Sequence, residues 1–173
     1  GTAKCNVRCP FCVAVMTPHY AKLPDLNVVN LRKGAKLSVR GGATTLLLTG
    51  KGEPTLYPDQ ITEILEEIGE DFPIVELQTN GLQIARGDIG HQTLSKWKAL
   101  GLTTIAVSCV HWDADINAMM NPREGTMPLL ADIIKIIKDD GFAVRLSVVM
   151  VKGGIDSVDA LKTFIRWGRD HKV

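Results

Sequence analysis

From about residue 26 onward, short apolar runs alternate with amphipathic stretches. Thr44–Thr49 is a β-rich apolar run without polar alternation, which is typical of a strand buried on both faces. Pro58–Ile68 instead places isoleucine and leucine on one face and acidic residues on the other, which predicts a helix. The same strand-then-helix pattern recurs to the end of the chain. This alternation predicts a parallel sheet with helices packed outside it.

The pattern gives approximate bounds for each expected element. The expected strands cover Thr44–Thr49, Ile74–Thr79, Thr103–Ser108 and Val144–Val151. The expected helices cover Leu26–Val39 with a glycine cap at Arg40–Gly42, Pro58–Ile68 capped by Asp59, Thr93–Leu100, Met127–Lys138, and a last helix capped by Asp156 or Ser157. Because a closed eight-unit barrel needs about 250 residues, the α/β pattern predicts an open, partial parallel barrel. A doubly wound sheet is the alternative.

Three cysteines stand close together before the first helix, at Cys5, Cys9 and Cys12. With 4 cysteines in 173 residues and no visible signal peptide, a disulfide framework is disfavoured. Cys109 lies in an apolar run and is expected to be a small buried side chain. A zinc site needs four ligands, so His19 or Cys109 would have to complete the triplet. An iron–sulfur cluster needs no such completion, because cysteine thiolates are its usual ligands and one iron can lack a protein ligand.

Composition narrows the classes of function. The 20 basic and 19 acidic residues leave a formal charge of +1, which gives no support for binding nucleic acid or an anionic membrane. No run approaches the roughly 20 apolar residues that span a bilayer. Length and a hydrophobic fraction of 45% suit a soluble α/β protein with one domain over residues 1–173. Because only four residues precede Cys5, we expect a first strand upstream and further elements downstream.

Unusual polar residues follow the expected strands, where a parallel α/β barrel carries its active site. Thr49–Thr55 contains Gly50, Gly52 and Glu53, so a ligand can approach the backbone while the carboxylate faces a cation. The alternative is an ordinary strand-to-helix turn. The third segment, Gln78–Gly81, is likewise either a turn or part of a site.

The cysteine pattern, Cys-x₃-Cys-x-Phe-Cys, resembles the signature of the radical S-adenosylmethionine (radical SAM) superfamily. Gly-Lys-Gly-Glu-Pro resembles that family's Gly-Gly-Glu-Pro motif, which binds the amino group of the methionine moiety. By this resemblance Gly52 and Glu53 bind the cofactor. Lys51 takes the place of the first glycine, so its backbone makes the contact and its side chain points away. Thr-Asn-Gly resembles the family's next strand ending, with Asn80 facing the site.

The resemblance assigns further cofactor contacts. Ser108 or Asp113 matches the region that binds the ribose, and Phe11 is the expected neighbour of the adenine. Val149 and Val151 match the segment whose apolar residues pack on adenine. Four further residues could either face the site or belong to the core or the surface: Cys109, His111, Trp112 and Arg123.

The resemblance also implies the chemistry. Cys5, Cys9 and Cys12 ligate three irons of a 4Fe-4S cluster, and S-adenosyl-L-methionine chelates the fourth. Reductive cleavage then yields methionine and a 5′-deoxyadenosyl radical, which abstracts hydrogen from an unidentified substrate. A reductant such as flavodoxin or ferredoxin, and a reducing cytoplasm, are implied. The alternatives are a structural zinc module, a non-catalytic cluster domain, or, within the enzyme class, an RNA-modifying or glycyl-radical-activating member. The near-neutral charge gives RNA no support.

Overall fold

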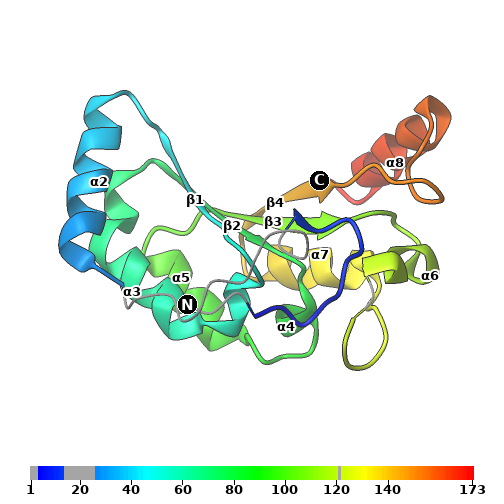
Figure 1. Cartoon of the computed structure of the whole chain (residues 1–173), viewed down its shortest axis with the longest axis horizontal. Helices are drawn as coiled ribbons and strands as arrows, with labels where there is room; N and C mark the ends of the chain where they lie inside the picture. The colour runs from blue at the N-terminus through cyan, green and yellow to red at the C-terminus, as the bar shows by residue number, and fades with distance from the viewer. Residues whose placement is uncertain (1–3, 14–25, 121) are drawn as a thin grey trace.

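Four parallel strands form one sheet in the order β1-β2-β3-β4 (Figure 1). This computed structural model describes residues 4–13, 26–120 and 122–173. The strands are β1 (Thr45–Leu48), β2 (Ile74–Thr79), β3 (Thr104–Cys109) and β4 (Ala143–Val148), and each pairs in parallel with the next along the chain. A doubly wound sheet reverses its strand order partway. The sequential order of the described strands is therefore that of an open, partial barrel.

Helices connect the strands and cover one side of the sheet. The longer ones are α2 (Val28–Arg40), α3 (Pro58–Ile68), α5 (His91–Ala99), α7 (Leu130–Asp139) and α8 (Val158–Asp170). Short turns of helix add η1 (Pro54–Leu56), η2 (Gly69–Asp71), α4 (Leu82–Ala85), α6 (Ala114–Asn117) and η3 (Ala118–Met120). In Figure 1, α3, α5 and α7 lie below the sheet. The long helices were predicted, whereas one-turn helices are too short to show a period in the sequence.

Besides shifts of one or two residues at the ends of other elements, three predictions were wrong. β4 ends at Val148 rather than Val151. α7 begins at Leu130 rather than Met127, because Pro128 disfavours helical geometry in the residue before it. The cap of α3 is Tyr57 with proline in the first position, so Asp59 lies inside the first turn, where its charge favours the helix dipole.

The core lies between the sheet and the helices. Alternate strand residues point to this side, among them Leu77, Val107 and Cys109, all fully buried. Trp97 of α5 is also fully buried, and its indole nitrogen donates to the Thr62 hydroxyl at 2.9 Å. The opposite, concave face is consequently left for polar side chains and a site.

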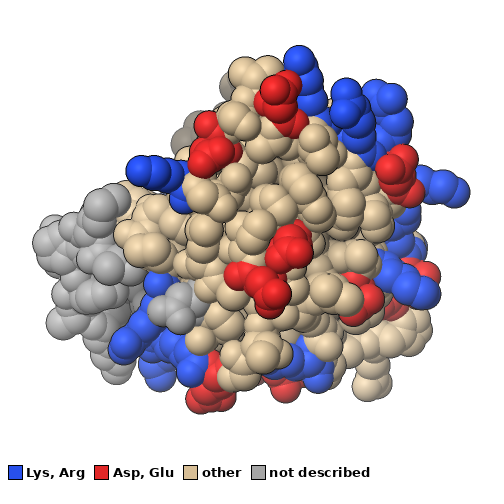
Figure 2. Space-filling view, turned by 90° about the vertical axis from the view of Figure 1, so that its right-hand side faces the viewer, with Lys and Arg blue, Asp and Glu red and all other residues tan. Residues whose placement is uncertain are grey.

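The described helices and one face of the molecule were compared with the features of a membrane span and of a strongly charged patch. None of the helices in the described ranges is long and apolar enough to cross a membrane. Figure 2 shows acidic and basic side chains together on one face, with neither sign covering it.

Candidate functional site

The cysteine loop lies across the carboxyl ends of the strands and is held there by backbone contacts. Val7 forms an antiparallel bridge with Pro122, and the Arg8 amide donates to the Met120 carbonyl at 3.2 Å. Around these contacts lies a second apolar cluster, separate from the main core: Val7, Cys9, Leu82, Val110, Met120 and Met127. The loop is thus packed against the end of the sheet.

A pocket of about 390 Å³ opens between this loop and the ends of the strands. Nine of the predicted site residues line it: Cys5, Cys9, Phe11, Cys12, Gly52, Glu53, Asn80, Ser108 and Val149. Gly52 has φ +96°, in the left-handed region that glycine occupies without strain. The structure therefore brings together five separate segments of the chain that the sequence had indicated one by one.

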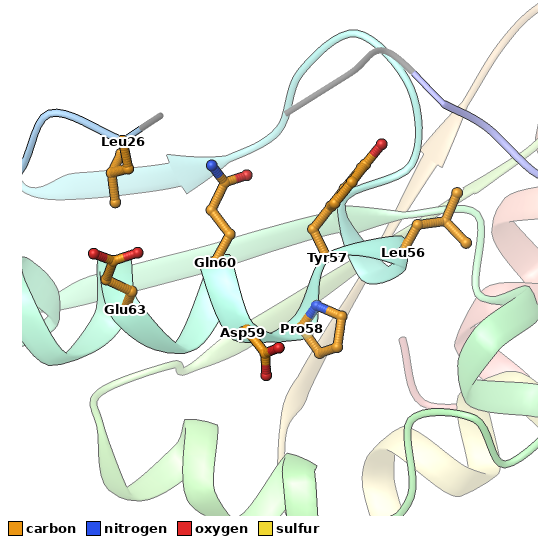
Figure 3. A pocket seen from close by; sticks show the side chains of 7 residues that line it. All are labelled: Leu26, Leu56, Tyr57, Pro58, Asp59, Gln60 and Glu63. Carbon is orange, nitrogen blue, oxygen red and sulfur yellow. The ribbon is translucent and has the colours of Figure 1, made fainter. Parts of the chain in front are cut away.

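Two predicted residues lie outside this pocket. Lys51 instead lines a separate groove of about 520 Å³ that runs along β1. Val151 packs against the second apolar cluster, because β4 ends three residues before it. Figure 3 shows another hollow, of about 570 Å³, at the start of α3. It is lined by residues such as Tyr57 and Glu63 and contains no cysteine. The pocket beside the cysteine loop is therefore the candidate functional site.

The three thiols lie in partly or wholly buried positions. Cys9 is buried, and its thiol donates to the Met120 carbonyl at 3.4 Å. Burial, together with the nearby Cys5 and Cys12 thiols, raises the pKa of Cys9 to about 11. Burial also raises the pKa of Cys5, with Glu53 and Cys12 adding to the effect. In the ionised form the thiolates of one loop repel one another, and positive charge beside them favours that form.

The described ranges offer no ready site for a single metal ion. No group of three cysteine, histidine or carboxylate side chains in them is arranged to hold one ion. Cys109 is fully buried among the residues of the main core, and burial raises its pKa to about 12. His19, the other candidate for a fourth zinc ligand, lies outside the described residues.

Glu53 lines the pocket and also accepts several hydrogen bonds from the protein. Its side chain is 3% exposed, and one carboxylate oxygen accepts from the Thr55 amide at 3.0 Å and from the Thr55 and Thr79 hydroxyls at 2.6 Å each. The other oxygen accepts from the Asn80 amide at 2.8 Å. The carboxylate thus joins the glycine turn to the end of β2.

Asn80 also makes protein contacts. Its side-chain amide donates to the Asn6 side-chain oxygen at 2.7 Å, and its own oxygen accepts from the Leu82 amide at 3.0 Å. Asn6 was not singled out from the sequence, since no spacing marks it and only the folded structure brings it to Asn80. The same is true of Met120.

The candidate residues at the end of β3 and after it have different surroundings. Ser108 lines the pocket, whereas the Asp113 carboxylate caps α6 by accepting from the Asp115 and Ile116 amides. Trp112 stacks on His111 at 3.8 Å between ring centroids and lies 6.0 Å from the Phe164 ring, so it is a packing residue. Arg123 is exposed, although its charge lowers the pKa of Cys5.

The concave face below the pocket carries cross-strand polar contacts that sequence reasoning missed. Gln78 accepts from the Thr49 hydroxyl at 3.3 Å and donates to the Ser147 hydroxyl at 3.1 Å. One step deeper, Arg145 forms two hydrogen bonds with Glu76, at 2.7 and 2.5 Å. β3 lies between these partners and contributes a small side chain, Ala106, opposite Gln78 and Arg145. This allows longer side chains from β2 and β4 to meet over it.

Sequence comparison finds relatives over nearly the whole chain. It is 28% identical to a GTP 3′,8-cyclase of Listeria monocytogenes over 99% of this chain and 50% of that protein. It is 30% identical to the GTP 3′,8-cyclase of Aquifex aeolicus over 88% of this chain and 46% of the relative. The chain therefore spans about half the length of these curated relatives.

Two solved structures share the fold. The crystal structure of HydG, a maturase of the [FeFe]-hydrogenase, superposes with a TM-score of 0.72 over 98% of this chain and 38% of its own, at 13% identity. Methylornithine synthase (PylB) gives a TM-score of 0.67 over 98% of this chain and 48% of its own, at 16% identity. At these identities the likeness concerns the fold. The sequence profile of the radical SAM superfamily matches residues 1–167. The chain belongs to the radical SAM superfamily, whose enzymes use a 4Fe-4S cluster and S-adenosylmethionine.

Proposed function

We propose that Cys5, Cys9 and Cys12 hold three irons of the cluster, and that the adjoining pocket holds S-adenosylmethionine against the fourth. The observation that carries this proposal is the shared pocket, which the three thiols line together with the ends of β1, β2 and β3. When bound, the two cofactors supply a reductive cleavage that removes a hydrogen atom from the substrate. The protein supplies position, orientation and exclusion of water.

The donor set fits such a cluster. Three thiols without a fourth described ligand leave one iron open, whereas a structural zinc site is closed by four ligands. The position of Cys109 in the main core sets it apart from the three thiols of the loop. We further propose that residues 1–173 act as one core domain around this site.

The pocket walls have the character that the two halves of S-adenosylmethionine require. Gly52 brings backbone, without a side chain, to the methionine end. The Ser108 hydroxyl is suited to the ribose hydroxyls, in preference to Asp113, which is occupied as a helix cap. Phe11 and Val149 offer apolar surface to the adenine. Lys51 and Val151 take no direct part in this arrangement.

Metal and sulfide analysis tests the cluster. After anaerobic reconstitution, the protein should contain about four irons and four sulfides per chain, with the fourth iron open to S-adenosylmethionine. One zinc per chain and no sulfide would contradict the proposal. Adding S-adenosylmethionine should also change the electron paramagnetic resonance signal of the reduced cluster, because it binds the open iron.

For the substrate, we propose a purine nucleotide, with GTP as the first candidate. Support comes from the GTP 3′,8-cyclases that align with 88–99% of this chain. On the concave face of the described strands, the single arginine, Arg145, is paired with Glu76. That face is therefore suited to the neutral base or sugar, and cations for the triphosphate must come from elsewhere in the protein.

Substrate-stimulated cleavage tests this choice. With dithionite and S-adenosylmethionine, GTP should raise the rate of 5′-deoxyadenosine formation and be converted to a new nucleotide product seen by mass spectrometry. Steady cleavage that GTP neither accelerates nor diverts would reject GTP while leaving the cofactor chemistry intact.

The electron donor is proposed to be a small redox protein of the flavodoxin or ferredoxin type. The loop carrying the cysteines has a solvent-exposed edge at Val13, beside Cys12, so an electron can reach the cluster from the surface. Reduced flavodoxin or ferredoxin should replace dithionite in the cleavage assay. Failure of both proteins to do so would exclude this class of donor.

A further inference from the structure

We propose that Glu53 and Asn80 are positioning residues that hold Cys5 from both sides, and that Asn6 completes their grip. The proposal rests on Cys5 being a cluster ligand. The carbonyl of Lys4 accepts from the Glu53 amide at 2.9 Å. On the other side of Cys5, the Asn6 side-chain oxygen accepts from Asn80 at 2.7 Å. The backbone is thus fixed immediately before and after the thiol.

The two anchors are also bonded to each other. The Asn80 amide donates to the Glu53 carboxylate at 2.8 Å, and the neighbouring Thr79 hydroxyl donates to the same group at 2.6 Å. Together with the contacts to the cysteine loop, these bonds close a ring through Lys4, Glu53, Asn80 and Asn6. Glu53 and Asn80 are 3% and 4% exposed, so water competes little for these bonds, and those to the carboxylate are charge-assisted.

The side chains of Asn80 and Asn6 both direct their polar atoms at protein groups. The Asn80 oxygen accepts from the Leu82 amide at 3.0 Å, while its nitrogen serves Asn6. The Asn6 nitrogen in turn donates to the Gln83 side chain at 3.3 Å, and the Asn6 carbonyl accepts from the Arg123 amide at 2.9 Å. Turning either side chain to a cofactor would leave a buried protein group unpaired, which is costly. Their task is accordingly to hold the loop.

A ligand held in this way is presented to the metal in the correct geometry before the metal binds. Residues that orient metal ligands commonly change metal affinity about 10–100-fold when they are replaced. The ring should therefore control how long the cluster survives, more than how tightly S-adenosylmethionine binds.

The test uses the reconstituted protein and its cluster lifetime. The variants Asn6→Leu and Asn80→Ala each remove one side of the contact, and Asn6→Asp keeps the oxygen that accepts from Asn80. Asn30→Leu, at an exposed position of α2, is the matched control. An iron chelator is added anaerobically, and the loss of cluster absorbance is followed while circular dichroism monitors the fold.

We expect half-lives about tenfold shorter in Asn6→Leu and Asn80→Ala. Asn6→Asp and Asn30→Leu should remain near the wild-type value, with circular dichroism unchanged in all four variants. Wild-type half-lives in both disruptive variants would overturn the proposal, as would equal losses in Asn6→Asp and Asn6→Leu. A weaker affinity for S-adenosylmethionine with an unchanged half-life would assign these residues to the cofactor instead. If the wild-type protein binds no cluster at all, the proposed function itself fails.

Discussion

Individual residues around the cysteine loop differ sharply in their surroundings, although they lie close together. Cys9 and Cys109 both line the pocket, but Cys9 belongs to the cysteine loop, whereas Cys109 is fully buried and packs in the main core. Thiol chemistry follows the thiolate, so burial in apolar surroundings separates a reactive cysteine from an inert one. Two predictions therefore distinguish the thiols of the loop from the thiol of Cys109 in the core.

Replacing Cys9 by alanine should abolish the cluster, because the loop then offers only two thiolates to the irons. Cys109→Ala is the matched control and should retain a full cluster, since its thiol belongs to the core. Iron and sulfide content after anaerobic reconstitution measures both. A Cys9→Ala protein with a normal complement of iron and sulfide would show that the ligand assignment is wrong.

Cys109 should resist alkylation in the folded protein. Its pKa of about 12 means that at pH 8 only about one molecule in 10⁴ carries the thiolate. Reactivity should rise with pH and appear fully only after unfolding. Mass spectrometry after iodoacetamide treatment, with and without urea, measures the labelled fraction. Rapid labelling of the native protein at this position would contradict the core assignment.

Glu53→Gln should destabilise the protein by about 1–3 kcal/mol. The carboxylate accepts at both oxygens, so an amide nitrogen placed at either one faces a donor that it cannot accept from. Urea unfolding of the metal-free protein measures this change. Glu63→Gln in α3 is the control, for which we expect a change within about 0.5 kcal/mol. Equal stabilities of the two variants would show that the Glu53 contacts are not needed.

At the scale of elements, the long strands and helices could be predicted because each displays a period or an apolar run. Val107, for example, lies in a continuous apolar run, and Leu77 alternates with polar neighbours, Glu76 and Gln78; both patterns are typical of strands. The one-turn helices α4 and α6 could not be predicted in the same way. The end of β4 was missed because Val149 and Val151 continue an apolar run beyond the last pairing of the strand.

Alanine substitutions at two glycines should have opposite effects on the stability of the protein. Gly69 follows α3 and lies so near the Leu100 carbonyl that an added methyl group would overlap it. Gly69→Ala should therefore destabilise the protein by about 1–3 kcal/mol. Gly34 lies within exposed α2 with open space around it, and Gly34→Ala should stabilise by about 0.5–1 kcal/mol. Thermal unfolding measures both, and a stabilised Gly69→Ala protein would contradict the packing described.

At the scale of the whole molecule, the fold brings distant segments to one place. The cysteine triplet, the glycine turn and the ends of β2 and β3 were predicted separately, and the pocket joins them. Sequence reasoning missed Asn6, Met120 and the Gln78–Ser147 contact, because these interactions depend on which segments meet in space. Lys51 stands between Gly50 and Gly52 and lines the groove along β1.

The most direct test of the account is reductive cleavage of S-adenosylmethionine by the reconstituted protein. We expect methionine and 5′-deoxyadenosine in equal amounts after dithionite reduction, measured by mass spectrometry, and neither from the variant in which Cys5, Cys9 and Cys12 are all alanine. A protein that holds about four irons and four sulfides but releases no 5′-deoxyadenosine would contradict the account, as would cleavage that persists without the three thiols.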